Sequence, residues 1–152
     1  MQMVCKIGYP LWQVEKPYKL NTNGRQTMVI GADIFHERRY SSIVSVCASM
    51  DKNFTDYYSV NDVIKREKEY IMRSVSKLVL DCVRKYGQKN KNSPDMIIFY
   101  RDGIGMGQYD EVRKYEISTI LDGLKEEFGD KAPKLAYIVV TKRINDRFFV
   151  QG

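Results

Sequence analysis

Apolar runs rich in β-branched residues alternate with polar segments along the chain and predict a series of strands. Three of these runs span residues 27–34 (TMVIGADI), 95–100 (DMIIFY) and 135–141 (LAYIVVT), and the near-continuous apolar character of the first is typical of a strand covered on both faces. Two further strands are predicted over residues 42–50 and 54–60. Only Asp51-Lys52-Asn53 separates them, and so short a polar connection favours an antiparallel hairpin.

The hydrophobic period changes between the third and fourth strands. Apolar residues recur there mostly at steps of three and four positions, which predicts a long helix with one apolar stripe formed by Ile71, Val75, Leu78, Val79, Cys82, Val83 and Tyr86. Asp62 is its predicted N-cap and Gly87 its predicted end. A second helix, ending at Gly129, is predicted from the spacing of Ile117, Ile120, Leu121, Leu124 and Phe128.

This order of elements predicts an α/β fold with two aspartates at one edge of the sheet. The right-handed crossover rule allows the fourth strand to lie parallel beside the first, so Asp33 and Asp102, near the carboxyl ends of those strands, become neighbours. Two buried carboxylates repel each other unless a cation joins them, and oxygen ligands suit Mg²⁺ or Mn²⁺. Such ions act on phosphodiesters. The alternative is that both aspartates are ordinary turn residues that cap the next segment of the chain.

The charge of the chain is unevenly distributed. Its 152 residues fit one domain and carry 25 Lys and Arg against 19 Asp and Glu, a net charge of +6. Between Asn61 and Asn92 there are nine basic and four acidic residues. Such a stripe suits a polyanion, but it is equally typical of a solvated helix face.

Cysteine usage and hydropathy exclude several classes of protein. Cys5, Cys47 and Cys82 are odd in number and widely spaced, which argues against a disulfide framework and a structural zinc site. The sequence has no apolar run of membrane-spanning length and no signal-peptide pattern, so we expect no membrane partner and an intracellular protein.

Three motifs together resemble the Piwi domain of the Argonaute/Piwi family. They are MVIGADIFHE at 28–37, IIFYRDGIGMGQ at 97–108 and YIVVTKR at 137–143. The likeness extends from Cys5-Lys6-Ile7-Gly8 to Arg143 and is closer to the Piwi branch than to the animal Argonaute branch. It implies a ribonuclease H-like fold, a mixed central sheet with helices on both faces.

The resemblance also implies a catalytic set of Asp, Glu, Asp and His that binds Mg²⁺ or Mn²⁺ in active members. Asp33 and Asp102 match the first and third members and are the implied metal ligands. Glu69 is the candidate for the second member, although an ungapped alignment places that member on Tyr70; Glu67 or the absence of this glutamate are the alternatives. The fourth member lies beyond residue 152 in the family. His36 matches a position that is not counted as catalytic.

The resemblance divides the chain into two segments. Residues 1–26 resemble the end of the Mid domain and the Mid–Piwi linker, and residues 27–152 resemble the N-terminal portion of a Piwi domain, so we expect a fragment truncated at its C-terminus. Lys6 matches a lysine that helps to hold the 5′ phosphate of the guide, and Gln2 is a candidate for a second contact with it.

Three functions stay open at this point. The resemblance implies binding of a small guide RNA and a complementary target RNA, with gene silencing of the Piwi-interacting RNA type and metal-dependent cleavage of the target by the complete protein. The alternatives are a guide-RNA carrier that recruits silencing proteins without cutting, and an inactive Piwi fragment. An unrelated α/β phosphohydrolase is remote because of the run from Tyr100 to Gln108. The expected location is the cytoplasm, the nucleus or both.

Overall fold

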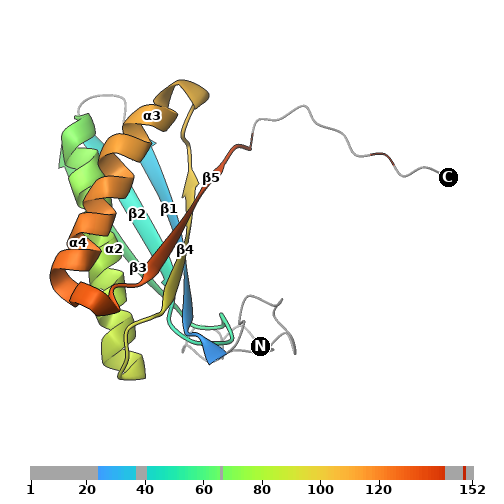
Figure 1. Ribbon diagram of the computed structural model, residues 1–152. Coiled ribbons are helices and arrows are strands. Elements are labelled where there is room, and N and C mark those ends of the chain that lie inside the picture. Colours follow the sequence, from blue (N-terminus) through green and yellow to red (C-terminus); the bar gives the residue numbers. More distant parts are fainter. Residues whose placement is uncertain (1–23, 37–40, 66, 143–148, 150–152) are drawn as a thin grey trace.

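A twisted five-stranded sheet with helices packed on one face forms the fold (Figure 1). The computed structural model describes residues 24–36, 41–65, 67–142 and 149, without the side chains of residues 68–70. The strands are β1 (Thr27–His36), β2 (Ser41–Ser49), β3 (Tyr57–Lys65), β4 (Met96–Asp102) and β5 (Lys134–Val140). Their order across the sheet is β3-β2-β1-β4-β5.

The sheet is mixed, as the order of elements predicted. β1, β2 and β3 form an antiparallel meander, whereas β4 pairs parallel with β1 and β5 pairs parallel with β4. The first and fourth strands are therefore neighbours, which confirms the crossover argument. No helix in the part of the chain that the structure describes is long and apolar enough to cross a membrane.

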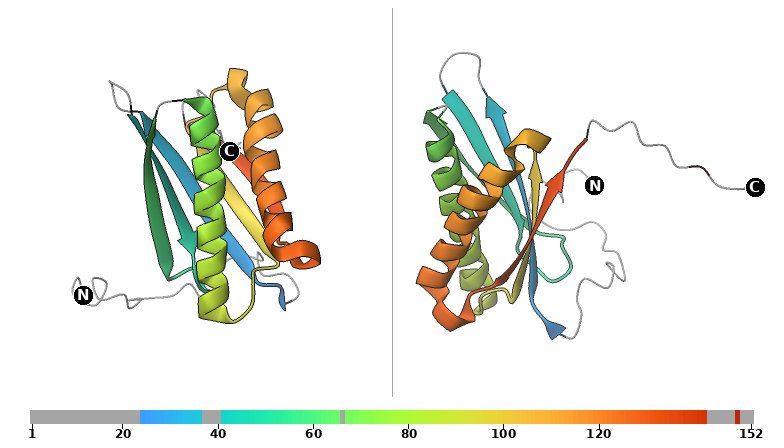
Figure 2. Two further views of the ribbon diagram at one scale, coloured as in Figure 1. Left: turned by 90° about the vertical axis from the view of Figure 1, so that its left-hand side faces the viewer. Right: turned by 45° about the horizontal axis from the view of Figure 1, so that its top comes forward.

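The two long helical segments lie side by side on the same face of the sheet (Figure 2). One is α2 (Lys68–Asn90). The other runs without a break through η2 (Met106–Gln108), α3 (Tyr109–Glu111), the π-helical η3 (Val112–Ile117) and α4 (Ser118–Phe128), before η4 (Gly129–Lys131). Helices on both faces were expected, but the described residues cover only one. The crossovers β3-α2-β4 and β4-α4-β5 advance in the same direction across the sheet, and right-handed crossovers in one direction place their helices on one face.

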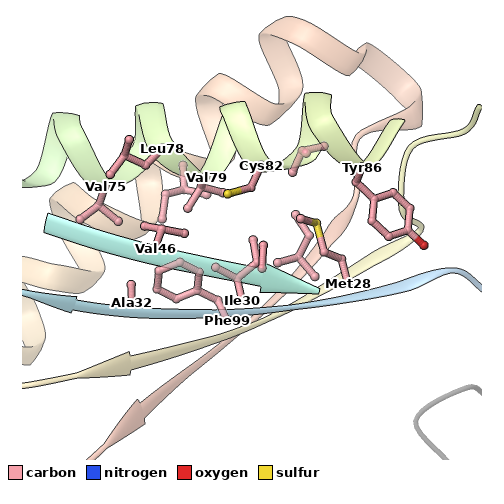
Figure 3. Packing of buried hydrophobic residues seen from close by; sticks show 14 of the residues in the cluster. Met28, Ile30, Ala32, Val46, Val75, Leu78, Val79, Cys82, Tyr86 and Phe99 are labelled. Carbon is pink, nitrogen blue, oxygen red and sulfur yellow. The ribbon is translucent and has the colours of Figure 1, made fainter. Parts of the chain in front are cut away.

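The core fills the space between this sheet face and α2 (Figure 3). Met28, Ile30 and Ala32 of β1 alternate toward the helices, and the apolar stripe predicted on α2 meets them: Val75, Leu78, Val79, Cys82, Val83 and Tyr86 are all buried. Because alternate residues of a strand face opposite sides, Gly31 and Asp33 must point to the other face of the sheet.

Two of the predicted helix boundaries are wrong. β3 does not end at Val60 but continues to Lys65, because it keeps pairing with β2 as far as Ser41. Asp62 is therefore a strand residue, and its carboxylate accepts a hydrogen bond of 3.0 Å from the Ser74 hydroxyl of α2. At the other end, α2 passes Gly87 and ends at Asn90, and its C-cap residue Lys91 has a φ of 63°. The predicted end of the second helix at Gly129, with a φ of 54°, is confirmed.

Asp51 organises the connection between β2 and β3. Its carboxylate accepts hydrogen bonds from the backbone N–H groups of Asn53, Thr55 and Asp56 and from the Thr55 hydroxyl, at 2.8–3.1 Å. Partial burial opposes ionisation of this carboxyl, but the hydrogen bonds from Asp56, Thr55 and Asn53 outweigh it and lower the pKa of Asp51.

Replacing Asp51 with alanine is expected to destabilise the chain by about 1–3 kcal/mol at pH 7, because the turn loses hydrogen bonds to a charged acceptor. The lowered pKa in the folded state means that this contribution is present above the ordinary pKa and is lost as the pH falls through the folded value. Urea unfolding from pH 7 to pH 2.5 should show the gap between wild type and Asp51→Ala narrowing only at the acid end. Lys52→Ala, an exposed neighbour, should match the wild type throughout.

Candidate active site

The register of β1 and β4 brings the two predicted aspartates together. Ala32 pairs with Arg101 in the parallel ladder, so Asp33 and Asp102 come next on adjacent strands. The residue after Asp102 shows how close the two strand ends are: a Cβ atom built on Gly103 would be 3.5 Å from Oδ1 of Asp33. Asp102 ends β4, whereas β1 continues to His36 because Asp33 still pairs with Ser45 of β2.

Both aspartates belong to the sheet face that the described helices leave open. Ala32 and Arg101, the preceding residues, are buried on the helical side, and side chains alternate along a strand. On the open face a groove of about 410 Å³ is lined by Asp33, Asp102 and small residues of the meander that include Gly31, Ser45 and Ser59. Small side chains let a ligand approach the backbone of the sheet closely.

The carboxylates are less buried than predicted. Asp33 is exposed and the Asp102 side chain is 24% exposed, because the groove opens to solvent. Repulsion between them is therefore weaker than for a fully desolvated pair. A cation is present nevertheless, because the ammonium of Lys142, two residues after β5, forms an ion pair with Oδ2 of Asp102.

Hydrogen bonds fix the carboxylates in a similar way. Oδ1 of Asp33 accepts the N–H of Ile34 at 2.8 Å, and Oδ1 of Asp102 accepts the N–H of Gly103 at 2.8 Å. The hydrogen bond from Lys142 is the main cause of the lowered pKa of Asp102, and burial opposes it. The same bond, with the charges of Asp102 and Asp33, raises the pKa of Lys142. The ion pair with Lys142 thus favours the ionised form of Asp102.

This arrangement fits a divalent metal ion. Two carboxylates on neighbouring strands already attract a cation, the Lys142 ammonium, and carboxylate oxygens are the ligands that Mg²⁺ and Mn²⁺ prefer. Within the described residues no third His, Cys, Asp or Glu side chain joins them. The donor set is therefore incomplete by itself, as expected of a site that also binds substrate or a further ligand.

The candidate second member, Glu69, lies in the first turn of α2, but its side chain falls outside the described residues. The next residues of that helix, Ile71 and Met72, line a second cavity of about 280 Å³ together with Arg101 and Gly103. The start of α2 is thus at the same end of the sheet as Asp102, on the helical side. The alternative, Glu67, is the exposed N-cap residue of α2.

Lys6, Gln2 and His36 were also singled out in the sequence. Lys6 and Gln2, the expected contacts to a guide phosphate, lie outside the described residues. His36 ends β1, is exposed, and its Nδ1 lies 2.9 Å from the Ser42 hydroxyl, a polar contact at a strand end.

Most of the described part of the basic stripe belongs to α2, which packs on the sheet face opposite to the aspartates. Its Arg84 pairs with Glu127 at 2.6 Å and with Asp81 at 2.7 Å, and Lys89 pairs with Asp56. These partners already neutralise part of the stripe, which favours the interpretation as a solvated helix face.

A buried charged network behind Asp102 was not predicted. The side chains of Arg101 and Glu116 are 7% and 1% exposed, and Arg101 Nε donates to Glu116 Oε1 at 3.1 Å. The Tyr137 hydroxyl donates to the same oxygen at 2.6 Å, and Arg101 Nη1 donates to the backbone carbonyl of Asp102. Burial, followed by the charge of Glu116, raises the pKa of Tyr137, so its hydroxyl keeps its proton.

One sequence signal could have found this network. Ile97, Phe99 and Arg101 share the core face of β4, so a charged residue occupies a position where apolar ones are expected. Such a residue needs a buried partner of opposite charge. Glu116 supplies it from η3, a π-helical segment. Lys142, by contrast, follows a strand end and carries no comparable signal.

Comparison with known proteins agrees with this geometry. The model of the Piwi domain matches residues 1–152. Piwi-like protein 1 of Gallus gallus is 36% identical over 154 residues, covering 100% of this chain and 17% of that protein. The crystal structure of Drosophila Piwi superimposes with a TM-score of 0.73 at 30% identity, over 93% of this chain and 18% of that one.

A structure of Kluyveromyces polysporus Argonaute with a guide RNA also matches, with a TM-score of 0.65 and 25% identity over 74% of this chain and 14% of that one. The chain thus spans only a small part of the length of the proteins it resembles. The resemblance drawn from the three motifs is confirmed, and the mixed sheet has the ribonuclease H-like form expected from it. With the domain model matching from the first residue to the last, the chain belongs to the Piwi family as part of a Piwi domain.

Proposed function

We propose that this chain is part of a small-RNA-guided silencing protein of the Piwi type, which binds a guide RNA and cleaves a complementary target RNA. The observation that carries the proposal is that Asp33 and Asp102 end up side by side on adjacent parallel strands at the edge of an open groove, with Asp102 in an ion pair with Lys142. Family membership supports silencing guided by small RNA in general. The proposed silencing takes place in the cytoplasm, the nucleus or both.

In this proposal Asp33 and Asp102 would hold Mg²⁺ or Mn²⁺ through their carboxylates, each of which is fixed by a backbone N–H that donates to its Oδ1 atom. When bound, such an ion stabilises the charge that develops on a phosphodiester during in-line displacement. Glu69 is the proposed third carboxylate. The small side chains of the groove let the sugar–phosphate backbone of the target lie close to the sheet.

The segment before β1 has a separate proposed role. Residues 1–26 would form the end of a Mid domain and its linker, with Lys6 and Gln2 at the 5′ phosphate of the guide. A lysine ammonium is a suitable phosphate ligand as a point charge.

A second candidate is a guide-RNA carrier that recruits silencing proteins without cutting. The observation in its favour is that, among the described side chains, only two acidic groups meet at the site. The two candidates share guide binding and differ in the chemistry at Asp33 and Asp102.

The first experiment is to purify the complete native protein with an antibody against this chain and to end-label the RNA that accompanies it. A narrow class of short RNA with 5′ phosphates is the expected result for both candidates. Absence of RNA from the native protein would contradict both and would favour an inactive Piwi relative. Incubating the purified complex with a matching target RNA and Mg²⁺ then separates cleavage from carriage.

A further inference from the structure

Lys142 lies where the metal ion of the proposed site would compete with it. It follows β5, whose last residue, Val140, pairs with Asp102 of β4. Its ammonium forms an ion pair with Oδ2 of Asp102 and lies within the field of Asp33. Arg101, the other basic residue nearby, points to the helical side of the sheet and donates a hydrogen bond to Glu116.

We propose that Lys142 is the resident counter-ion of the Asp33–Asp102 pair, and that a divalent metal ion binds there only by displacing its ammonium. Lys142 then sets the affinity of the site for metal. This inference rests on the proposed function, because it concerns the same two carboxylates.

The hydrogen bonds of the site support displacement. Asp102 accepts the Gly103 N–H at Oδ1 and pairs with Lys142 at Oδ2, so the ammonium already stands at Oδ2, one of the two oxygens that could bind a metal ion. A divalent ion and an ammonium repel each other at such short range and cannot share that oxygen.

The exposure of Lys142 makes the exchange inexpensive. Its side chain is 70% exposed, against 24% for Asp102, so the ammonium can move into water while the carboxylate stays in place. Lysine has a flexible four-carbon stem and a strongly hydrated head, both of which favour release. An exposed ion pair of this kind contributes little free energy, so it lowers metal affinity without blocking the site.

The test is a Mn²⁺ titration of the complete protein, followed by the electron paramagnetic resonance signal of the free ion. Lys142→Met removes the charge and keeps most of the side-chain volume. We expect it to bind Mn²⁺ about two- to five-fold more tightly than the wild type, the range that corresponds to a weak exposed ion pair. Lys134→Met, at the far end of β5 from Lys142, is the matched control and should leave the affinity unchanged.

Lys142→Arg keeps the positive charge and should bind Mn²⁺ no more tightly than the wild type. The inference would be overturned if Lys142→Met bound Mn²⁺ as tightly as the wild type or less tightly. Even then, loss of Mn²⁺ binding in Asp33→Asn would show that the metal site itself exists. If Asp33→Asn binds Mn²⁺ as well as the wild type, the metal site itself is wrong and the role of Lys142 fails with it.

Discussion

Replacing Asp33 with alanine is expected to slow target cleavage by the complete protein at least about 100-fold while guide loading stays unchanged. The variant removes one of two carboxylates that would hold the metal ion, and a metal ion contributes several kcal/mol to transition-state stabilisation in such reactions. Asp33 is exposed on the open face of the sheet, so its loss creates no cavity in the core. Single-turnover cleavage of an end-labelled target, with guide RNA quantified in the same sample, measures both quantities.

Asp122→Ala is the matched control, because Asp122 is an exposed aspartate of α4 on the helical side, away from the groove. It should cleave and load like the wild type. Loss of guide loading by Asp33→Ala would mean that Asp33 serves RNA binding, and undiminished cleavage would place the chemistry elsewhere. If Asp102→Ala keeps full silencing of targets in cells, the non-cleaving carrier becomes the better explanation.

The strands and the core were predictable because they follow from local periodicity. The apolar stripe on α2 meets the alternate residues of β1 as its spacing required. The boundary between β3 and α2 was not predictable in the same way. Asp62 is a favourable N-cap residue in isolation, but pairing of Asp62 with Val44 of β2 outweighs that local preference.

The meeting of Asp33 and Asp102 could be predicted because parallel strands bring their carboxyl ends to one edge. Their side-chain partners could not. Lys142 reaches Asp102 from a different strand, and the degree of exposure of each carboxylate depends on which sheet face the helices cover. The sequence did not predict which sheet face the helices cover, because the handedness of the crossovers determines that face only once the strand order is known.

Replacing Glu116 with alanine is expected to be the most destabilising of the changes considered, at about 3–5 kcal/mol, because it leaves the Arg101 guanidinium buried without a partner. Denaturant unfolding of the chain, followed by circular dichroism, measures this directly. Tyr137→Phe is the matched comparison: it removes one hydrogen bond to the same Glu116 oxygen and leaves the ion pair, so its cost should be about 1.5–3 kcal/mol.

The double variant Arg101→Met/Glu116→Leu distinguishes a buried charge from simple loss of packing. It removes both charges and keeps apolar volume, so it should recover much of the stability that Glu116→Ala loses. A loss for Glu116→Ala no larger than that for Tyr137→Phe would contradict the assignment of the ion pair. The network also bears on the site: Arg101 donates to the carbonyl of Asp102, so freeing its guanidinium should loosen the strand end that carries this carboxylate and weaken Mn²⁺ binding together with stability.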